Sequence, residues 1–211
     1  MLIASIVSFC FLLGTALAYK KNSLFSSICY AISLAALSVI AFIGMDFSPS
    51  LTAIFLVVAL ILCCVGEVCR RLGQSKGYVW LELAQYPLSF IGIAFTFPSV
   101  YIYAVGCDPL NFYTVTAIVL SLLITAVWLF FTKRKNGIVV TLLKGLEALL
   151  FLLTGLFCLL CGLSSPALLP YGIGILCLFT AKRFEKTPFH LFVFWLGVLL
   201  MDVFLVAPMV F

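Results

Sequence analysis

Long apolar runs of about bilayer length, separated by short polar segments, constrain this chain more than any other feature. A helix needs about 20 apolar residues to cross the hydrocarbon core of a membrane, where every backbone hydrogen bond must be satisfied internally. Eight runs can be recognised, at Leu2–Ala18, Leu24–Met45, Leu51–Cys69, Tyr78–Ala104, Phe112–Thr132, Ile138–Cys161, Ala167–Ala181 and Pro188–Val210. The sequence therefore predicts an all-α, polytopic transmembrane helical bundle of about eight spans, with residues 1–211 forming a single transmembrane domain.

The composition excludes an ordinary water-soluble domain. Of the 211 residues, 65% are hydrophobic and 9% are charged, whereas soluble domains carry about 25% charged residues. The net charge of +5 comes from small basic clusters between the apolar runs, without interleaved aromatic residues. This pattern indicates membrane lipids as partners, through their phosphates, and no nucleic acid.

The basic residues also predict an orientation. Eleven of the twelve lie in alternate connections, at 20–21, 70–76, 133–135 and 182–186, and the connections between these hold none. Because basic loops stay on the cytoplasmic side, both termini are expected on the non-cytoplasmic side. The localisation predicted is a multi-pass protein of the cell membrane, the inner membrane in a bacterium.

Two of the runs contain helix-disrupting residues. The fourth includes Pro87 and Pro98, which predict a kink or an early end followed by a re-entrant stretch. The seventh is short, and Pro170, Gly172 and Gly174 are expected to break it. Irregular backbone at membrane depth occurs where it lines a cavity, so both runs are candidates for the walls of a binding site.

Few ionisable residues fall inside the runs, and each is a candidate for function. A charge at the centre of a bilayer costs at least about 2.5–3.5 kcal/mol, so such residues usually face the interior of a bundle. They are Glu67, Glu82, Lys144, Glu147 and Asp202.

Structural roles compete with these functional ones. Glu67 shares a helical face with Arg70 and Arg71, which predicts a salt bridge as readily as a site. Lys144 and Glu147 are three residues apart and predict a buried ion pair. Glu82 is expected to reach the headgroups, with Tyr86 one turn further on. Asp202 has only apolar neighbours, which favours a functional role.

The sequence predicts neither a metal nor a cofactor. Cys158 and Cys161 form a CxxC pair, but no second pair and no histidine accompany it. His190, the single histidine, begins the last run beside basic residues and is expected to be an interfacial side chain. Signatures of nucleotide-binding loops, serine hydrolases and zinc proteases are absent.

The layout resembles the YhhN family of eight-span membrane proteins, which includes lysoplasmalogenases. The similarity lies in a lysine before the second run, a glycine–acid pair in the third, a glycine-rich seventh run leading to Arg-Phe, and an acid in the last. These are Lys20 and Lys21, Gly66-Glu67, Gly172–Phe179 with Arg183-Phe184, and Asp202. The family has Gly-Asp where this chain has Gly-Glu, and its histidine in the fourth run and Ser-Asp in the seventh have no counterpart here.

The resemblance implies hydrolysis of the vinyl ether bond of lysoplasmalogen-type lysophospholipids. This reaction needs an acid and a base, a task suited to paired carboxylates, and the expected catalytic residues are Glu67 with Glu147 or Asp202. The expected substrate-binding residues are Lys20, Lys21 and Lys144 for the phosphate, and Glu82 and Tyr86 for the cavity. The alternative is a non-enzymatic membrane protein, such as a transporter or binding component for a small solute or a lipid.

Overall fold

The computed structural model of this protein describes residues 2–17, 24–47, 51–105, 137–184 and 187–206, and within them every regular element is helical. The elements are α1 (Leu2–Leu17), α2 (Leu24–Phe47), α3 (Leu51–Lys76), α4 (Val79–Leu83), α5 (Gln85–Val105), α7 (Gly137–Ser164), the 3-10 helix η2 (Pro166–Leu168), α8 (Leu169–Arg183) and α9 (Phe189–Val206). The all-α prediction is confirmed for these residues. The fifth predicted run, Lys20 and Lys21 lie outside them.

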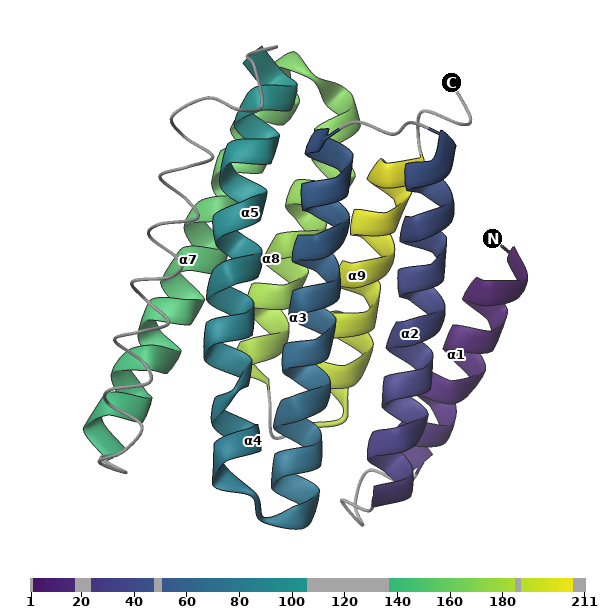
Figure 1. Ribbon diagram of the computed structural model, residues 1–211, viewed down its shortest axis with the longest axis vertical. Coiled ribbons are helices and arrows are strands. Elements are labelled where there is room, and N and C mark those ends of the chain that lie inside the picture. Colours follow the sequence, from purple (N-terminus) through teal and green to yellow (C-terminus); the bar gives the residue numbers. More distant parts are fainter. Residues whose placement is uncertain (1, 18–23, 48–50, 106–136, 185–186, 207–211) are drawn as a thin grey trace.

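The long helices lie side by side in one bundle, and α1 and α2, α3 and α5, α7 and α8, and α8 and α9 run in opposite directions (Figure 1). The pairs α1 and α2, α3 and α5, α7 and α8, and α8 and α9 are in contact. The ends of α3 and α8 lie with the starts of α7 and α9, at the lower end in Figure 1. We call this the basic end, because Lys76 and Lys182 are in the last turns of α3 and α8.

Many large apolar side chains are exposed on the surface of the bundle. Leu24–Ile43, Thr52–Lys76 and Val140–Leu163 are each long and apolar enough to cross a bilayer. On α7, the side chains of Ile138, Leu160 and Leu163 are 69%, 66% and 79% exposed. Exposed apolar area on this scale indicates contact with lipid, and the helical fold with its three long apolar spans is that of a membrane protein.

The interrupted fourth run forms two helices. The chain turns at Ala84, between α4 and α5. Pro87 then falls in the first turn of α5, where its missing N–H removes no helical hydrogen bond. Beyond it, α5 continues through Pro98 to Val105. The predicted kink is therefore present at the Pro87 end, and Pro98 does not end the helix.

The prediction that the seventh run is broken is wrong. α8 is continuous from Leu169 to Arg183, and Pro170 occupies its first turn. Gly172 and Gly174 serve close packing instead. A Cβ atom on Gly174 would lie 2.6 Å from the Gly197 carbonyl oxygen of α9, and one on Gly197 would lie 2.7 Å from the Gly174 carbonyl oxygen. Small residues at this crossing let the two backbones touch, as is common between helices in membranes.

Gly174→Ala is expected to lower the free energy of unfolding by about 1–2 kcal/mol, because the added methyl group forces α8 and α9 apart. Thermal unfolding of the purified protein in detergent measures the change. The matched control is Gly145→Ala on α7, where a Cβ atom meets nothing within 4 Å. The control should retain or slightly raise stability, since alanine favours helix. Equal stability of Gly174→Ala and the control would contradict the close crossing.

Candidate functional site

Glu67 lies within α3 near the basic end, and its side chain is buried. It is 1% exposed and accepts a hydrogen bond from Arg70 Nε at 3.0 Å, while Arg70 Nη2 contacts the second carboxylate oxygen. The predicted salt bridge between these residues is confirmed. The prediction that the third run stops at Arg70 and Arg71 is wrong, because α3 continues to Lys76 and both arginines are buried. The burial of these two charged side chains is tolerated because each guanidinium has polar partners.

Arg71 points toward α2 and not toward Glu67. Its Nη2 donates to Ser26 Oγ at 3.2 Å, and its guanidinium lies 5.2 Å from the centre of the Tyr30 ring. Successive residues on a helix point about 100° apart. Arg70 therefore points to the centre of the bundle, and Arg71 lies at the contact of α2 with α3.

His190, expected at the interface, is fully buried, and that prediction is wrong. Its Nε2 lies 2.8 Å from Glu67 Oε1 and 2.9 Å from Arg70 Nη2, and its Nδ1 lies 3.0 Å from the Ala181 carbonyl oxygen. The sequence signal was the position of this lone histidine, one turn after a basic connection and at the start of an apolar run.

The contacts of His190 determine where its protons can be. Ala181 offers only an acceptor, so Nδ1 carries a hydrogen. Nε2 can then donate to the Glu67 carboxylate as part of an imidazolium, or accept from Arg70 as a neutral ring. In the first of these states, an imidazolium N–H donates to a carboxylate, which is an arrangement that acid–base chemistry uses.

Lys182 joins the two predicted catalytic carboxylates. Its Nζ lies 3.1 Å from Glu147 Oε1 and 3.9 Å from Glu67 Oε2, and it donates to Gln85 Oε1 at 3.0 Å. Predicted in a loop, Lys182 lies instead in the last turn of α8, and its side chain is 7% exposed. We call Glu67, Arg70, Glu147, Lys182 and His190 the charge cluster. It connects α3, α7, α8 and α9.

Asp202, the third predicted catalytic carboxylate, is separate from the charge cluster. It lies twelve residues after His190 on α9, about 18 Å along the helix axis at 1.5 Å per residue. The side chain is 1% exposed, and neither carboxylate oxygen has a hydrogen-bond partner among the described residues. The structure therefore brings Glu67 and Glu147 together and leaves Asp202 apart.

The predicted substrate-binding residues are dispersed. Glu82, on α4, is partly exposed and accepts from Gln74 Nε2 at 3.3 Å. Tyr86 is buried and packs with Phe90. Lys144 lies on the exposed side of α7, and the ion pair of Glu147 is made with Lys182 instead of this predicted partner.

Cysteine and acidic side chains form no metal site in the described part of the chain. No group of three His, Cys, Asp or Glu side chains is close enough there to hold an ion. Cys158 and Cys161 are both free thiols, and Cys158 is buried. The charge cluster itself offers carboxylate, guanidinium, imidazole and ammonium groups.

Comparison with known proteins adds no relative: no family model, curated protein or solved structure matches this chain.

Proposed function

We propose that this protein crosses the membrane eight times, with the basic end in the cytoplasm and both termini on the other side. The antiparallel course of the connected helices supports this (Figure 1). So does the position of Lys76 and Lys182 at one end of the bundle. Basic residues retained on one face follow the positive-inside rule.

We further propose that the charge cluster catalyses hydrolysis of the vinyl ether bond of a lysoplasmalogen-type lysophospholipid. The observation that carries this proposal is that Glu67 and Glu147, from α3 and α7, meet at the single ammonium of Lys182. Carboxylates in two different environments can take the separate roles of acid and base. Glu67 has donors at both oxygens, whereas Glu147 Oε1 has the Lys182 ion pair and accepts no hydrogen bond from the described residues.

The roles follow from these partners. In the imidazolium state of His190, the Nε2 proton that faces Glu67 is transferred to the β-carbon of the vinyl ether, which leaves an oxocarbenium ion. Glu147, held by Lys182, takes a proton from water as the water oxygen bonds to that cationic carbon. The resulting hemiacetal breaks its C–O bond to give an aldehyde and a glycerophosphoalcohol. The proton on Glu147 then restores the Glu67–His190 pair through solvent.

Glu147→Gln is expected to reduce aldehyde release at least about 100-fold, the usual effect of losing an acid–base group. The assay uses purified protein in detergent with lysoplasmenylethanolamine, and measures the aldehyde formed. Thr141→Val is the matched control, since Thr141 is exposed on the same helix and bonds only its own backbone turn. Its activity should equal that of the unaltered protein. Absence of aldehyde from the unaltered protein would reject the hydrolase, as would full activity of Glu147→Gln.

A second candidate is a non-enzymatic membrane protein that transports or binds a small solute or a lipid. The observation in its favour is that Glu67 is already saturated: Arg70 Nε occupies Oε2, while Arg70 Nη2 and His190 occupy Oε1. Such a network can simply hold helices together. A protein that releases no aldehyde but loses stability when Glu67 is replaced would support this candidate.

A further inference from the structure

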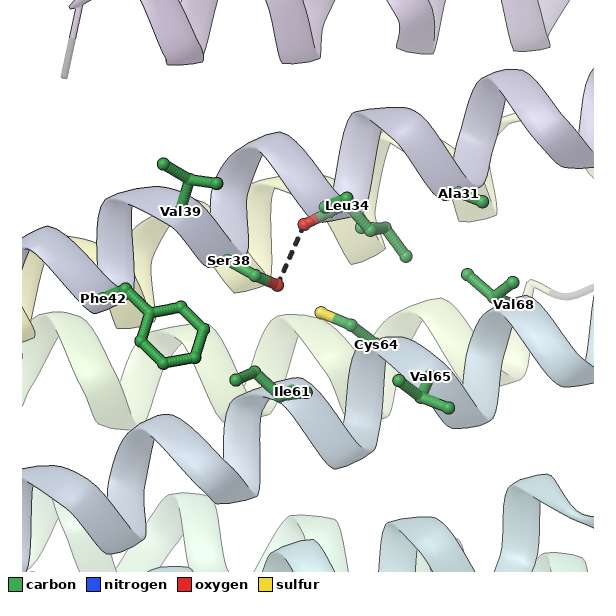
Figure 2. Close-up of a pocket in the computed structure, with 10 residues that line it drawn as sticks. Ala31, Leu34, Ser38, Val39, Phe42, Ile61, Cys64, Val65 and Val68 are labelled. Atoms are coloured by element: carbon green, nitrogen blue, oxygen red, sulfur yellow. Dashed lines mark hydrogen bonds between the residues drawn. The ribbon is translucent and has the colours of Figure 1, made fainter.

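An apolar groove lies between α2 and α3, apart from the charge cluster. Its volume is about 390 Å³, and all ten lining residues come from these two helices. Leu34 and Cys64 form a buried floor, while Val39, Phe42 and Val65 form an exposed rim. Figure 2 shows Phe42 and Ser38 of α2 facing Ile61 and Cys64 of α3 across this space.

Small residues on α2 create the groove. Ala31, Ala35 and Ser38 recur at the spacing of one helical face and leave room beside α3. The one hydroxyl among them, Ser38 Oγ, donates to the Leu34 carbonyl oxygen at 3.1 Å within its own helix (Figure 2). The lining therefore offers no unmet hydrogen bond from this hydroxyl, and it favours a purely hydrocarbon occupant.

The length of the groove fits one membrane leaflet. Its lining on α2 extends from Ala31 to Phe42, which are eleven positions apart and so about 17 Å apart along the axis. The hydrocarbon core of a bilayer is about 30 Å thick, so the groove covers roughly the depth that one acyl chain occupies. Its open rim faces outward from the two helices, where lipid chains can enter.

A fixed positive charge lies beyond one end of the groove. Cys64, Val68 and Arg71 occupy the same face of α3, so Arg71 follows Val68 by one turn toward the basic end. Its guanidinium is held by Ser26 and by the Tyr30 ring. Arg71 is 4% exposed, so its charge can attract a lipid phosphate without direct contact. An apolar groove with a fixed positive charge beyond its end complements a lipid, which carries its phosphate next to its chains.

We propose that the groove between α2 and α3 is a binding site for one acyl chain of an anionic glycerophospholipid in the basic-end leaflet, with the lipid phosphate directed toward Arg71. The site is independent of the proposed hydrolysis, because its lining belongs to α2 and α3 whereas the charge cluster joins α3 to α7, α8 and α9. It holds a resident lipid regardless of whether the cluster is catalytic.

Native mass spectrometry of the full chain in detergent, titrated with phosphatidylglycerol, tests this proposal. We expect one molecule to be retained, and Ala35→Phe to weaken its binding at least about tenfold by filling the groove. Ala35 is exposed, so the larger ring needs no rearrangement of the core. Ser38→Leu is a second variant that fills the same space and should act in the same direction.

Two controls define the site. Leu153→Phe, at a 52% exposed position on α7, should bind phosphatidylglycerol like the unaltered protein. Diacylglycerol with the same chains lacks the phosphate and should bind the unaltered protein more weakly. Unchanged phosphatidylglycerol affinity in both groove variants would overturn the acyl-chain site. Equal affinities for the two lipids would overturn the role assigned to Arg71.

Discussion

Lys182→Met is expected to lower the free energy of unfolding by about 3–5 kcal/mol, the usual cost of removing one partner from a buried ion pair. The ammonium contacts both Glu67 and Glu147 and donates to Gln85. Methionine keeps the length and apolar stem of the side chain, so the change in the free energy of unfolding reports the loss of the ammonium charge. The measurement is the denaturation midpoint in detergent, followed by helical circular dichroism. Lys76→Met, at an exposed position in the last turn of α3, should have little effect.

A double variant separates the ion pair from general damage to packing. Glu147→Gln removes the carboxylate that is 3.1 Å from Lys182, so Lys182→Met should cost less in that background than alone. The difference is the coupling between the two residues, expected at about 0.5–3 kcal/mol for groups in contact. Additive effects would show that Lys182 stabilises the bundle by another route.

Asp202→Leu is expected to raise the free energy of unfolding by about 1–3 kcal/mol, because it removes a buried polar group that lacks hydrogen bonds. Asp202 is 1% exposed, and its oxygens have no partner among the described residues. Leucine branches at the same atom and replaces the two oxygens by methyl groups of similar position. Natural proteins retain such unfavourable residues mainly where they serve a function.

Thermal unfolding and the aldehyde assay, applied to the same Asp202→Leu preparation, give that prediction two readouts. Asp202→Asn keeps the size and polarity, and should gain no stability. A more stable Asp202→Leu protein with full activity would place the residue outside the proposed reaction. Loss of stability in Asp202→Leu would mean that the carboxyl group stabilises the folded protein, contrary to the prediction.

The sequence predicted the helices better than it predicted their ends. Apolar runs specify helices in lipid because a helix satisfies all its backbone hydrogen bonds within one segment. The helices α1, α2 and α7 begin within one residue of the predicted positions. The end of α3 was misplaced because Arg70 and Arg71 were treated as solvent-exposed stop signals. Their partners, such as Ser26 and His190, are distant in sequence, and no local pattern reveals them.

The sequence also predicted only part of the candidate site, because contacts between residues distant in sequence leave no local pattern. Burial of Glu67, Glu147 and Asp202 follows from the cost of a charge in hydrocarbon. Which groups meet depends on helix rotation and packing, so Lys182 and His190 were missed as members of the charge cluster. Lys182 follows an apolar run and resembles a loop residue, yet the close approach of α8 to α9 directs both residues to Glu67.

The backbone contact between Gly174 and Gly197 has a consequence for assembly during synthesis. It makes α8 and α9 a paired unit, with Lys182 and His190 on either side of their connection. A ribosome produces Glu147 before either of these residues, so α7 is synthesised before its ion-pair partner Lys182. Glu67 emerges with Arg70 nearby and can be neutralised at once. The hairpin of α8 and α9 therefore supplies the ammonium that pairs with Glu147 after α7 has already been made.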